Sequence, residues 1–235
     1  MFRKTLGSLF AVLAVLATDV PSAQAQVRQS VSLNLGYFAT PPEDARGVGD
    51  VMVENLNFLL FDLRDFNGAA VSGDWLVEFG DFLEAGVGVG YHKRSVPSVY
   101  SDFVDSDNTE ISQDLKLRVT PLTMTVRFLP FGRRSAVQPY VGAGVGVYNW
   151  RYAETGEFID FSDDSIFRGS YVDKGTDVGS VFLGGVRVPV GDVLAAGIEF
   201  VYQNGKGTLD SSKGFLGDTV DLSGWLTQFT VRVRF

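Results

Sequence analysis

Apolar and polar residues alternate along the last stretch of the chain, from Trp225 to Phe235. The odd positions are mainly apolar or aromatic, and the even positions are mainly polar. A period of two predicts a β-strand with one apolar and one polar face. The polar face carries Arg232 and Arg234, which the apolar core of a soluble protein would not accept. We therefore expect a strand with lipid on one side and a polar lumen on the other.

The same alternation recurs in seven earlier segments, so the sequence predicts eight strands. These strands lie at about 27–38, 71–79, 83–94, 115–128, 141–152, 177–190, 194–203 and 225–235. The first and last should pair, because both turn a polar face inward. The segment 40–68 could hold a short helix or extend the second strand, and the sequence leaves both open.

The apolar positions change phase within the fourth predicted strand. They are odd from Leu115 to Val119 but even from Leu122 to Phe128. A one-residue shift of this kind is typical of a β-bulge, where proline is tolerated. We therefore predict a bulge at Pro121.

The connections between the predicted strands alternate between long and short. Short turns are expected at Gly80-Asp81, at 132–135 and at Gly191-Asp192. Barrels of the bacterial outer membrane have short turns at one end and long loops at the other. A closed sheet also leaves no unpaired edge inside lipid. The sequence therefore predicts an all-β fold, an eight-stranded antiparallel up-and-down transmembrane β-barrel over residues 26–235.

The N-terminus has the pattern of a secretory signal. Arg3 and Lys4 precede an apolar run from Leu6 to Ala17, and Ala23-Gln24-Ala25 is typical of a cleavage site. We expect residues 1–25 to be a cleaved signal peptide. No later run of eighteen apolar residues predicts a membrane-spanning helix. Together with the strand pattern, this predicts a location in the outer membrane of a Gram-negative bacterium.

The segment from Gln26 to Phe235 resembles the small barrels of the outer-membrane protein A, W and X group. The resemblance rests on the signal, the sorting of the loops and the terminal residues 231–235. It implies a C-terminal insertion signal on the apolar positions of the last strand, which are Trp225, Phe229, Val231, Val233 and Phe235. It also implies outer-membrane lipids, lipopolysaccharide and the barrel-insertion machinery as partners. The peptidoglycan-binding domain that follows some of these barrels is not expected.

Several polar side chains fall on inward positions. They are Glu84, His92, Arg94, Arg127, Arg187, Glu199, Arg232 and Arg234. Side chains can fill the interior of eight strands, so we expect a plugged core in which Glu84 and Glu199 pair with arginines. Inward glycines of the third and fifth strands should make room for them. A narrow channel, or a gate made by breakable ion pairs, is the alternative.

Catalysis is not expected, and neither is a cofactor. The family resemblance implies that lipid-modifying barrels of this size use a serine, a histidine and a carboxylate near the outer rim. The one histidine, His92, has Ser95 three positions along, on the opposite face of a strand. The G-x-S-x-G motif is absent as well.

The long loops are acidic, notably between Asp102 and Glu110 and between Glu154 and Asp164. These carboxylates could collect Ca²⁺ or Mg²⁺, but no spacing matches an EF-hand, and a hydrated surface explains them as well. The net charge of −8 argues against a nucleic-acid partner. Since the chain has no cysteine, it has no thiolate metal site.

Aromatic residues near the strand ends predict two girdles at the membrane surfaces. The expected outer girdle is Tyr100, Tyr148, Trp150 and Tyr152, and the expected inner one is Trp75, Phe79, Phe128 and Phe235. The sequence thus predicts a non-enzymatic integral outer-membrane protein with a structural or surface-interaction role and long acidic extracellular loops. Passage of a small solute or hydrophobic compound is the alternative, and a rim-located lipid-modifying enzyme is the third hypothesis.

Overall fold

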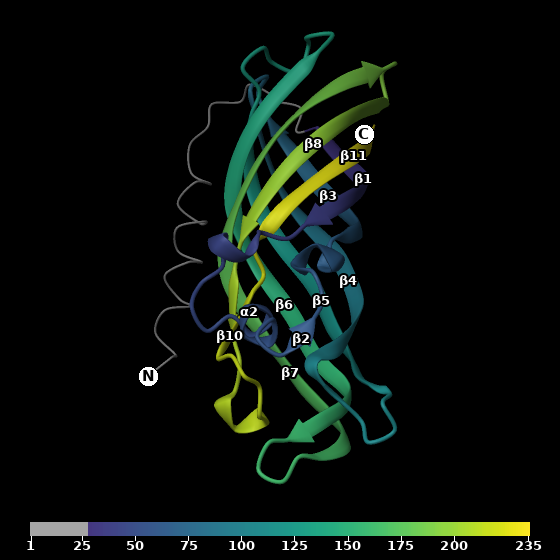
Figure 1. Ribbon diagram of the computed structural model, residues 1–235. Helices are drawn as coiled ribbons and strands as arrows, with labels where there is room; N and C mark the ends of the chain where they lie inside the picture. The colour runs from purple at the N-terminus through teal and green to yellow at the C-terminus, as the bar shows by residue number, and fades with distance from the viewer. Residues whose placement is uncertain (1–27) are drawn as a thin grey trace, which may run out of the picture.

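In the computed structural model, which describes residues 28–235, an antiparallel sheet closes into a ring of eight strands (Figure 1). The strands of the ring are β1 (Gln29–Ala39), β3 (Gly68–Phe79), β4 (Leu83–Val104), β5 (Glu110–Phe128), β6 (Gln138–Asp160), β7 (Ser165–Val190), β8 (Leu194–Asn204) and β11 (Gly224–Arg234). The first and last strands pair from Ser30 opposite Arg234 to Ala39 opposite Trp225. The predicted barrel and its predicted closing pair are confirmed. The predicted signal peptide lies outside the described residues.

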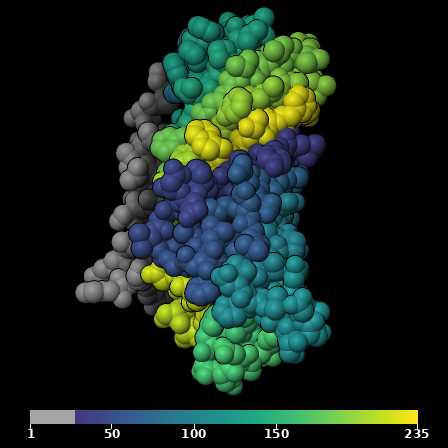
Figure 2. Space-filling view, in the orientation of Figure 1, coloured from purple at the N-terminus to yellow at the C-terminus, as the bar shows by residue number. Residues whose placement is uncertain are grey.

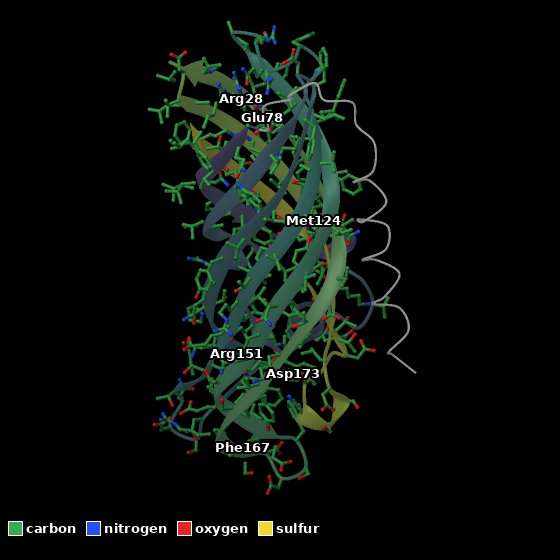
Figure 3. The ribbon with its side chains drawn as sticks, turned by 180° about the vertical axis from the view of Figure 1, so that it is seen from behind. Arg28, Glu78, Met124, Arg151, Phe167 and Asp173 are labelled. Carbon is green, nitrogen blue, oxygen red and sulfur yellow. The ribbon has the colours of Figure 1, made fainter. Side chains whose placement is uncertain are left out.

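Three short turns join strands at one end of the barrel, which we call the turn end. Gly80, Gly132 and Gly191 occupy these turns with φ of +65°, +69° and +73°. A residue without Cβ adopts this left-handed backbone at little cost. All three turns lie where the sequence predicts them. Arg28 and Glu78 mark the turn end in Figure 3, and we call the opposite end the loop end.

The strands differ greatly in length. β1, β3, β8 and β11 have 11 or 12 residues, whereas β4, β5, β6 and β7 have 22, 19, 23 and 26. As a result, two tall hairpins, β4–β5 and β6–β7, extend past the rest of the wall at the loop end (Figure 1).

The tall hairpins correct two predicted loops. Residues 97–110 and 153–176 fall in the long loops expected between predicted strands, but most of both segments is strand. β6 pairs with β7 without a break as far as Asp160 opposite Ser165. Acidic residues and glycine have low strand propensity, so these segments have the composition of loops. The two strands of each hairpin stabilise each other through main-chain hydrogen bonds, which residue propensities do not predict.

The remaining elements fill the open side between the hairpins. They are η1 (Glu43–Ala45), α2 (Val51–Asn55), β2 (Leu59–Leu60), η2 (Leu63–Phe66), β9 (Lys206–Thr208), η3 (Ser211–Lys213) and β10 (Thr219–Asp221). We call residues 40–67 and 205–222 together the cap. Segment 40–68, left open by the sequence, thus contains both a short helix and a short strand, and β2 pairs with β4. Figure 2 shows 40–67, in purple and blue, covering this face of the molecule.

None of the helices within residues 28–235 has the length and hydropathy needed to cross a membrane.

The two faces of the wall exchange polarity at one level of the barrel. Towards the turn end, apolar side chains of β5 from Leu122 to Phe128 point outward and are exposed, and Arg127 points inward. Towards the loop end, Leu115 and Leu117 point inward and are buried, and the polar Lys116 points outward. The interior of the barrel is therefore polar between this level and the turn end, and apolar between this level and the loop end.

This exchange explains the change of phase in β5, and the predicted bulge at Pro121 is wrong. The pairing of β5 with β6 runs without a shift from Gln113 to Phe128. Successive side chains of β5 point alternately inward and outward along the whole strand. What changes is the surroundings of each face, because the outside turns from apolar to aqueous along the strand.

A row of polar residues marks the level of the exchange on the outer face. Thr120 lies opposite Asn149, and Asn149 lies opposite Thr176. The Asn149 amide donates to the Thr176 hydroxyl at 3.1 Å. We take the apolar outer band between this row and the turn end as the membrane-spanning part. Met124 lies within it in Figure 3.

The predicted outer girdle is wrong for the same reason. Tyr148, Trp150 and Tyr152 point into the barrel and are fully buried, and Tyr100 is half-buried against the cap. The aromatic residues predicted for the other girdle, Trp75, Phe79, Phe128 and Phe235, are exposed on the outer face.

The outer band predicts a contrast between two arginine substitutions on the same side of β5. Met124→Arg should lower the free energy of unfolding in lipid vesicles by about 2–4 kcal/mol, because its charge would enter hydrocarbon. Thr120→Arg, at the polar row, should cost at most about 1 kcal/mol. Urea titrations of both variants measure the difference, and equal costs would place the membrane elsewhere.

Candidate functional site in the barrel interior

The centre of the barrel interior is a carboxylate held by two arginines. The carboxylate of Glu84 (β4) accepts a hydrogen bond from Arg187 Nη1 (β7) at 2.9 Å. Arg187 Nη2 also donates to it, and Arg232 Nη1 (β11) lies 3.1 and 3.2 Å from its two oxygens. All three side chains are at most 4% exposed. Since they come from strands on different sides of the ring, their ion pairs cross the lumen.

A second group of charges lies beside the first. Arg127 Nη1 (β5) is 3.1 Å from Glu199 Oε2 (β8), and Arg127 Nη2 is 3.7 Å from Asp74 Oδ2 (β3). Gln228 donates to the other oxygen of Glu199 at 2.7 Å. Three carboxylates therefore face three guanidinium groups, which balances the charge of what we call the charged cluster: Asp74, Glu84, Arg127, Arg187, Glu199 and Arg232.

Neutral groups complete the charged cluster. The Tyr140 ring lies between two guanidinium groups, with its centre 5.5 Å from Arg127 Cζ and 5.6 Å from Arg187 Cζ. Cations are attracted to the faces of aromatic rings at such distances. Gln138 accepts from Arg187 Nε at 2.8 Å, and Asn34 donates to Asp74 at 2.7 Å. Such neighbours are needed because a buried charge requires several partners.

Inward glycines leave room for the arginine stems. A Cβ added at Gly142 would lie 3.1 Å from Arg127 Cγ, and one added at Gly197 would lie 2.9 Å from Arg187 Cβ. Both distances are shorter than ordinary van der Waals contact. Gly142 belongs to the fifth predicted strand, as expected, whereas Gly197 lies on β8.

Among the predicted lumen residues, the structure brings Glu84, Arg127, Arg187, Glu199 and Arg232 together. Sequence reasoning missed Asp74, Gln138, Tyr140 and Asn34, of which Asp74 and Asn34 fall on the polar faces of predicted strands. The alternation of polar and apolar residues in those strands could have identified Asp74 and Asn34. Gln138 lies before the predicted start of its strand, and an aromatic residue gives no signal of contact with a charge.

Three other predicted lumen residues lie outside the charged cluster. Arg94 is exposed, and its Nε donates to the Asp65 carbonyl at 3.1 Å. At this height the inward positions of β4 face the cap, so Arg94 does not reach the lumen. Arg234 lies half-buried at the turn end, where its Nη2 is 3.4 Å from Gln138 Oε1.

The third, His92, anchors the cap. Its ring nitrogens lie 3.3 Å from the Ala69 carbonyl and 3.2 Å from the Phe66 carbonyl, and the side chain is buried. Ser95 is exposed, as the alternation predicts. Both nitrogens of His92 therefore face main-chain oxygens, and neither faces a hydroxyl that it could activate.

Between the charged cluster and the loop end, the cap and the barrel wall form an apolar layer. Its buried members are Val51, Met52, Leu59, Leu63, Phe66, Val96, Leu115, Leu117, Val119, Tyr148, Trp150, Tyr152, Val181, Leu209, Val220 and Leu222. These residues come from α2, β2 and η2, from the tall hairpins and from the cap segment after β8. The apolar layer closes the interior at the loop end.

A buried ion pair ties the two parts of the cap together. Arg46 Nε lies 3.0 Å from Asp50 Oδ1, and both side chains are at most 1% exposed. Asp50 also begins α2, because the same oxygen accepts from the Met52 amide at 3.1 Å. Its other oxygen accepts from the Asp221 amide at 2.6 Å. One carboxylate therefore fixes both the helix and the second cap segment.

A cavity of about 70 Å³ lies between the apolar layer and the charged cluster. Its lining includes His92, Val119, Leu183, Arg127 and Glu199. A water molecule takes up about 30 Å³ in the liquid. This cavity has room for water but not for a ligand of ordinary size.

The acidic loops hold their carboxylates apart. No three acidic or histidine side chains within residues 28–235 are grouped closely enough to hold a metal ion. Asp107 instead accepts from the Thr109 hydroxyl at 2.6 Å and from the Thr109 amide at 3.0 Å. These hydrogen bonds lower the pKa of the Asp107 carboxyl, so it stays charged in water.

No protein-family model and no curated protein matches the sequence. Among solved structures, the chain is similar to the outer membrane protein OprG from Pseudomonas aeruginosa, with 13% identity and a TM-score of 0.51, over 89% of this chain and 96% of that one. It has the fold of a small outer-membrane β-barrel protein. The Neisserial surface protein A gives 15% identity and a TM-score of 0.47, over 88% of this chain and 97% of that one.

The charged cluster predicts a large effect of removing its centre. Glu84→Ala would leave Arg187 and Arg232 facing each other in a buried site, at a cost of about 3–5 kcal/mol in the free energy of unfolding. Arg64→Ala, which removes an exposed ion pair with Asp62, should cost less than about 1 kcal/mol. Urea unfolding in detergent micelles compares the two. A small effect of Glu84→Ala would show that water reaches the cluster.

Proposed function

We propose that the chain is an integral outer-membrane protein whose barrel is sealed and which acts in envelope structure or surface interaction. The observation that carries this proposal is the filling of the interior at two separate levels. The charged cluster occupies the membrane-spanning part, and the apolar layer closes the loop end. A solute would have to break buried ion pairs and also displace the cap.

The outer surface supports a membrane location. Most side chains on the outward face of β11, and that of Phe235 directly after it, are exposed and apolar, as lipid contact requires. They are Trp225, Phe229, Val231, Val233 and Phe235. Their role as an insertion signal read by the barrel-insertion machinery, and the contact with lipopolysaccharide, remain predictions from the sequence.

The tall hairpins support a role at the cell surface. They carry the acidic turns around Asp107 and Asp164 beyond the membrane-spanning part, into the surrounding medium. Because both ring nitrogens of His92 face main-chain oxygens, we also propose that the protein is not an enzyme.

A sealed interior predicts that planar bilayers containing the folded protein show no reproducible unitary conductance steps. Arg232→Ala, which removes a lumen-crossing arginine, should leave the apolar layer in place and the barrel closed. Single-channel recordings of both proteins, with an established porin as a positive control, make the comparison.

Reproducible steps in the unmodified protein that change size in Arg232→Ala would contradict the sealed barrel. They would favour the alternative function, passage of a small solute through a gate made by the charged cluster.

A further inference from the structure

A second, larger pocket opens at the loop end, outside the membrane-spanning part. It has a volume of about 180 Å³ and lies between the tall hairpins and the cap. Six aromatic side chains line it: Phe58, Tyr100, Phe158, Phe161, Phe167 and Tyr171. Phe167 marks this region in Figure 3, far along the molecule from Met124.

The aromatic rings lie in two groups. In the first, Phe58 and Phe161 have ring centres 5.7 Å apart. In the second, the Phe158 ring lies 4.7 Å from Tyr171 and 5.9 Å from Phe167. Phe58, Phe161 and Phe167 are 36%, 55% and 40% exposed. Their faces are therefore open to water in a part of the chain where no lipid covers them.

The floor of this pocket is polar and buried. Glu154 is 5% exposed, and its Oε1 accepts from Asn55 Nδ2 at 2.6 Å and from the Tyr152 hydroxyl at 3.0 Å. Both donors are neutral, and no ion pair within residues 28–235 compensates the carboxylate. Gln113, also 5% exposed, lines the same pocket, and its Oε1 has no hydrogen-bond partner within residues 28–235.

This arrangement is costly for the protein alone. A buried carboxylate without a cation is unfavourable, and burial raises the pKa of Glu154. An unpaired amide oxygen adds a desolvation penalty. Both costs fall when a ligand brings a positive charge or an N–H donor to these oxygens.

The aromatic rings favour the same kind of ligand as the polar floor does, namely a cation. The face of an aromatic ring attracts cations through its quadrupole, most strongly where water is excluded. An anion would be repelled by Glu154, and a neutral apolar ligand would leave the Glu154 charge uncompensated and the Gln113 oxygen unpaired. The acidic side chain of Asp160, between the lining residues Ile159 and Phe161, would raise the local concentration of cations.

We propose that this pocket binds a small organic ammonium ion, whose apolar substituents lie against the aromatic rings and whose positive charge meets Glu154. The inference deepens the proposed surface role and rests on it only in placing the pocket on the outside of the cell.

Choline tests this inference, with 3,3-dimethylbutan-1-ol as its uncharged analogue of the same shape. Isothermal titration calorimetry of the full chain folded in detergent should show binding of choline, at least about tenfold tighter than the analogue. Glu154→Gln should weaken choline binding about tenfold or more. Glu157→Gln is the matched control, because Glu157 lies on the same strand and pairs with Arg168 at 3.2 Å.

Folding of the variants is checked independently of binding. Glutamine keeps an oxygen that Asn55 and Tyr152 can reach, so Glu154→Gln should retain the heat-dependent shift in electrophoresis that marks a folded barrel. Phe161→Ala alters an exposed side chain and should weaken choline binding about fivefold with no effect on folding.

Three outcomes would overturn the inference. They are no binding of choline at millimolar concentration, equal binding of the uncharged analogue, and undiminished choline binding by a folded Glu154→Gln or Phe161→Ala variant. Failure of the sealed barrel would appear instead as conductance in bilayers and would leave the binding results unchanged.

Discussion

Side-chain direction alternates with a fixed period in a β-strand, whereas the surroundings of this barrel change along its axis. In the membrane-spanning part lipid covers the outer face, so apolar side chains point outward and polar ones are confined to the lumen. Beyond the row of Thr120, Asn149 and Thr176, water covers the outer face, and the preference of each face reverses. Most features of the molecule depend on this reversal.

The two halves of the interior are stabilised by different interactions. In the membrane-spanning half, charged groups have no bulk water, so Glu84, Arg187 and Arg232 compensate one another across the lumen. In the other half, the wall turns apolar residues inward and needs a partner to cover them. The cap supplies that partner, and the Arg46–Asp50 ion pair holds its two segments in place. The cap therefore serves to bury the apolar inner face of the tall hairpins.

The sequence predicts the parts of the fold that depend on local pattern. Eight alternating segments and three glycine turns predict the ring, and inward positions bring Glu84, Arg187 and Arg232 together. The predicted outer girdle is wrong because it rests on the rule that apolar side chains in a barrel, such as Trp150, face lipid. That rule holds only within the membrane. The change of phase in β5 marks where the membrane-spanning part ends, but in the sequence alone it has the pattern of a β-bulge. Contacts such as Asn55 with Glu154, 99 residues apart, depend on how the cap folds back and have no local signal.

The three tryptophans test the reversal of polarity most directly, because Trp75 and Trp225 are exposed on the outer face and Trp150 is buried inside. Variants that keep one tryptophan, with phenylalanine at the other two positions, can be folded into vesicles of lipids with brominated chains. The structure predicts strong quenching of Trp75 and Trp225 fluorescence and little quenching of Trp150. Quenching of Trp150 as strong as that of Trp75 would place it against lipid and contradict the reversal.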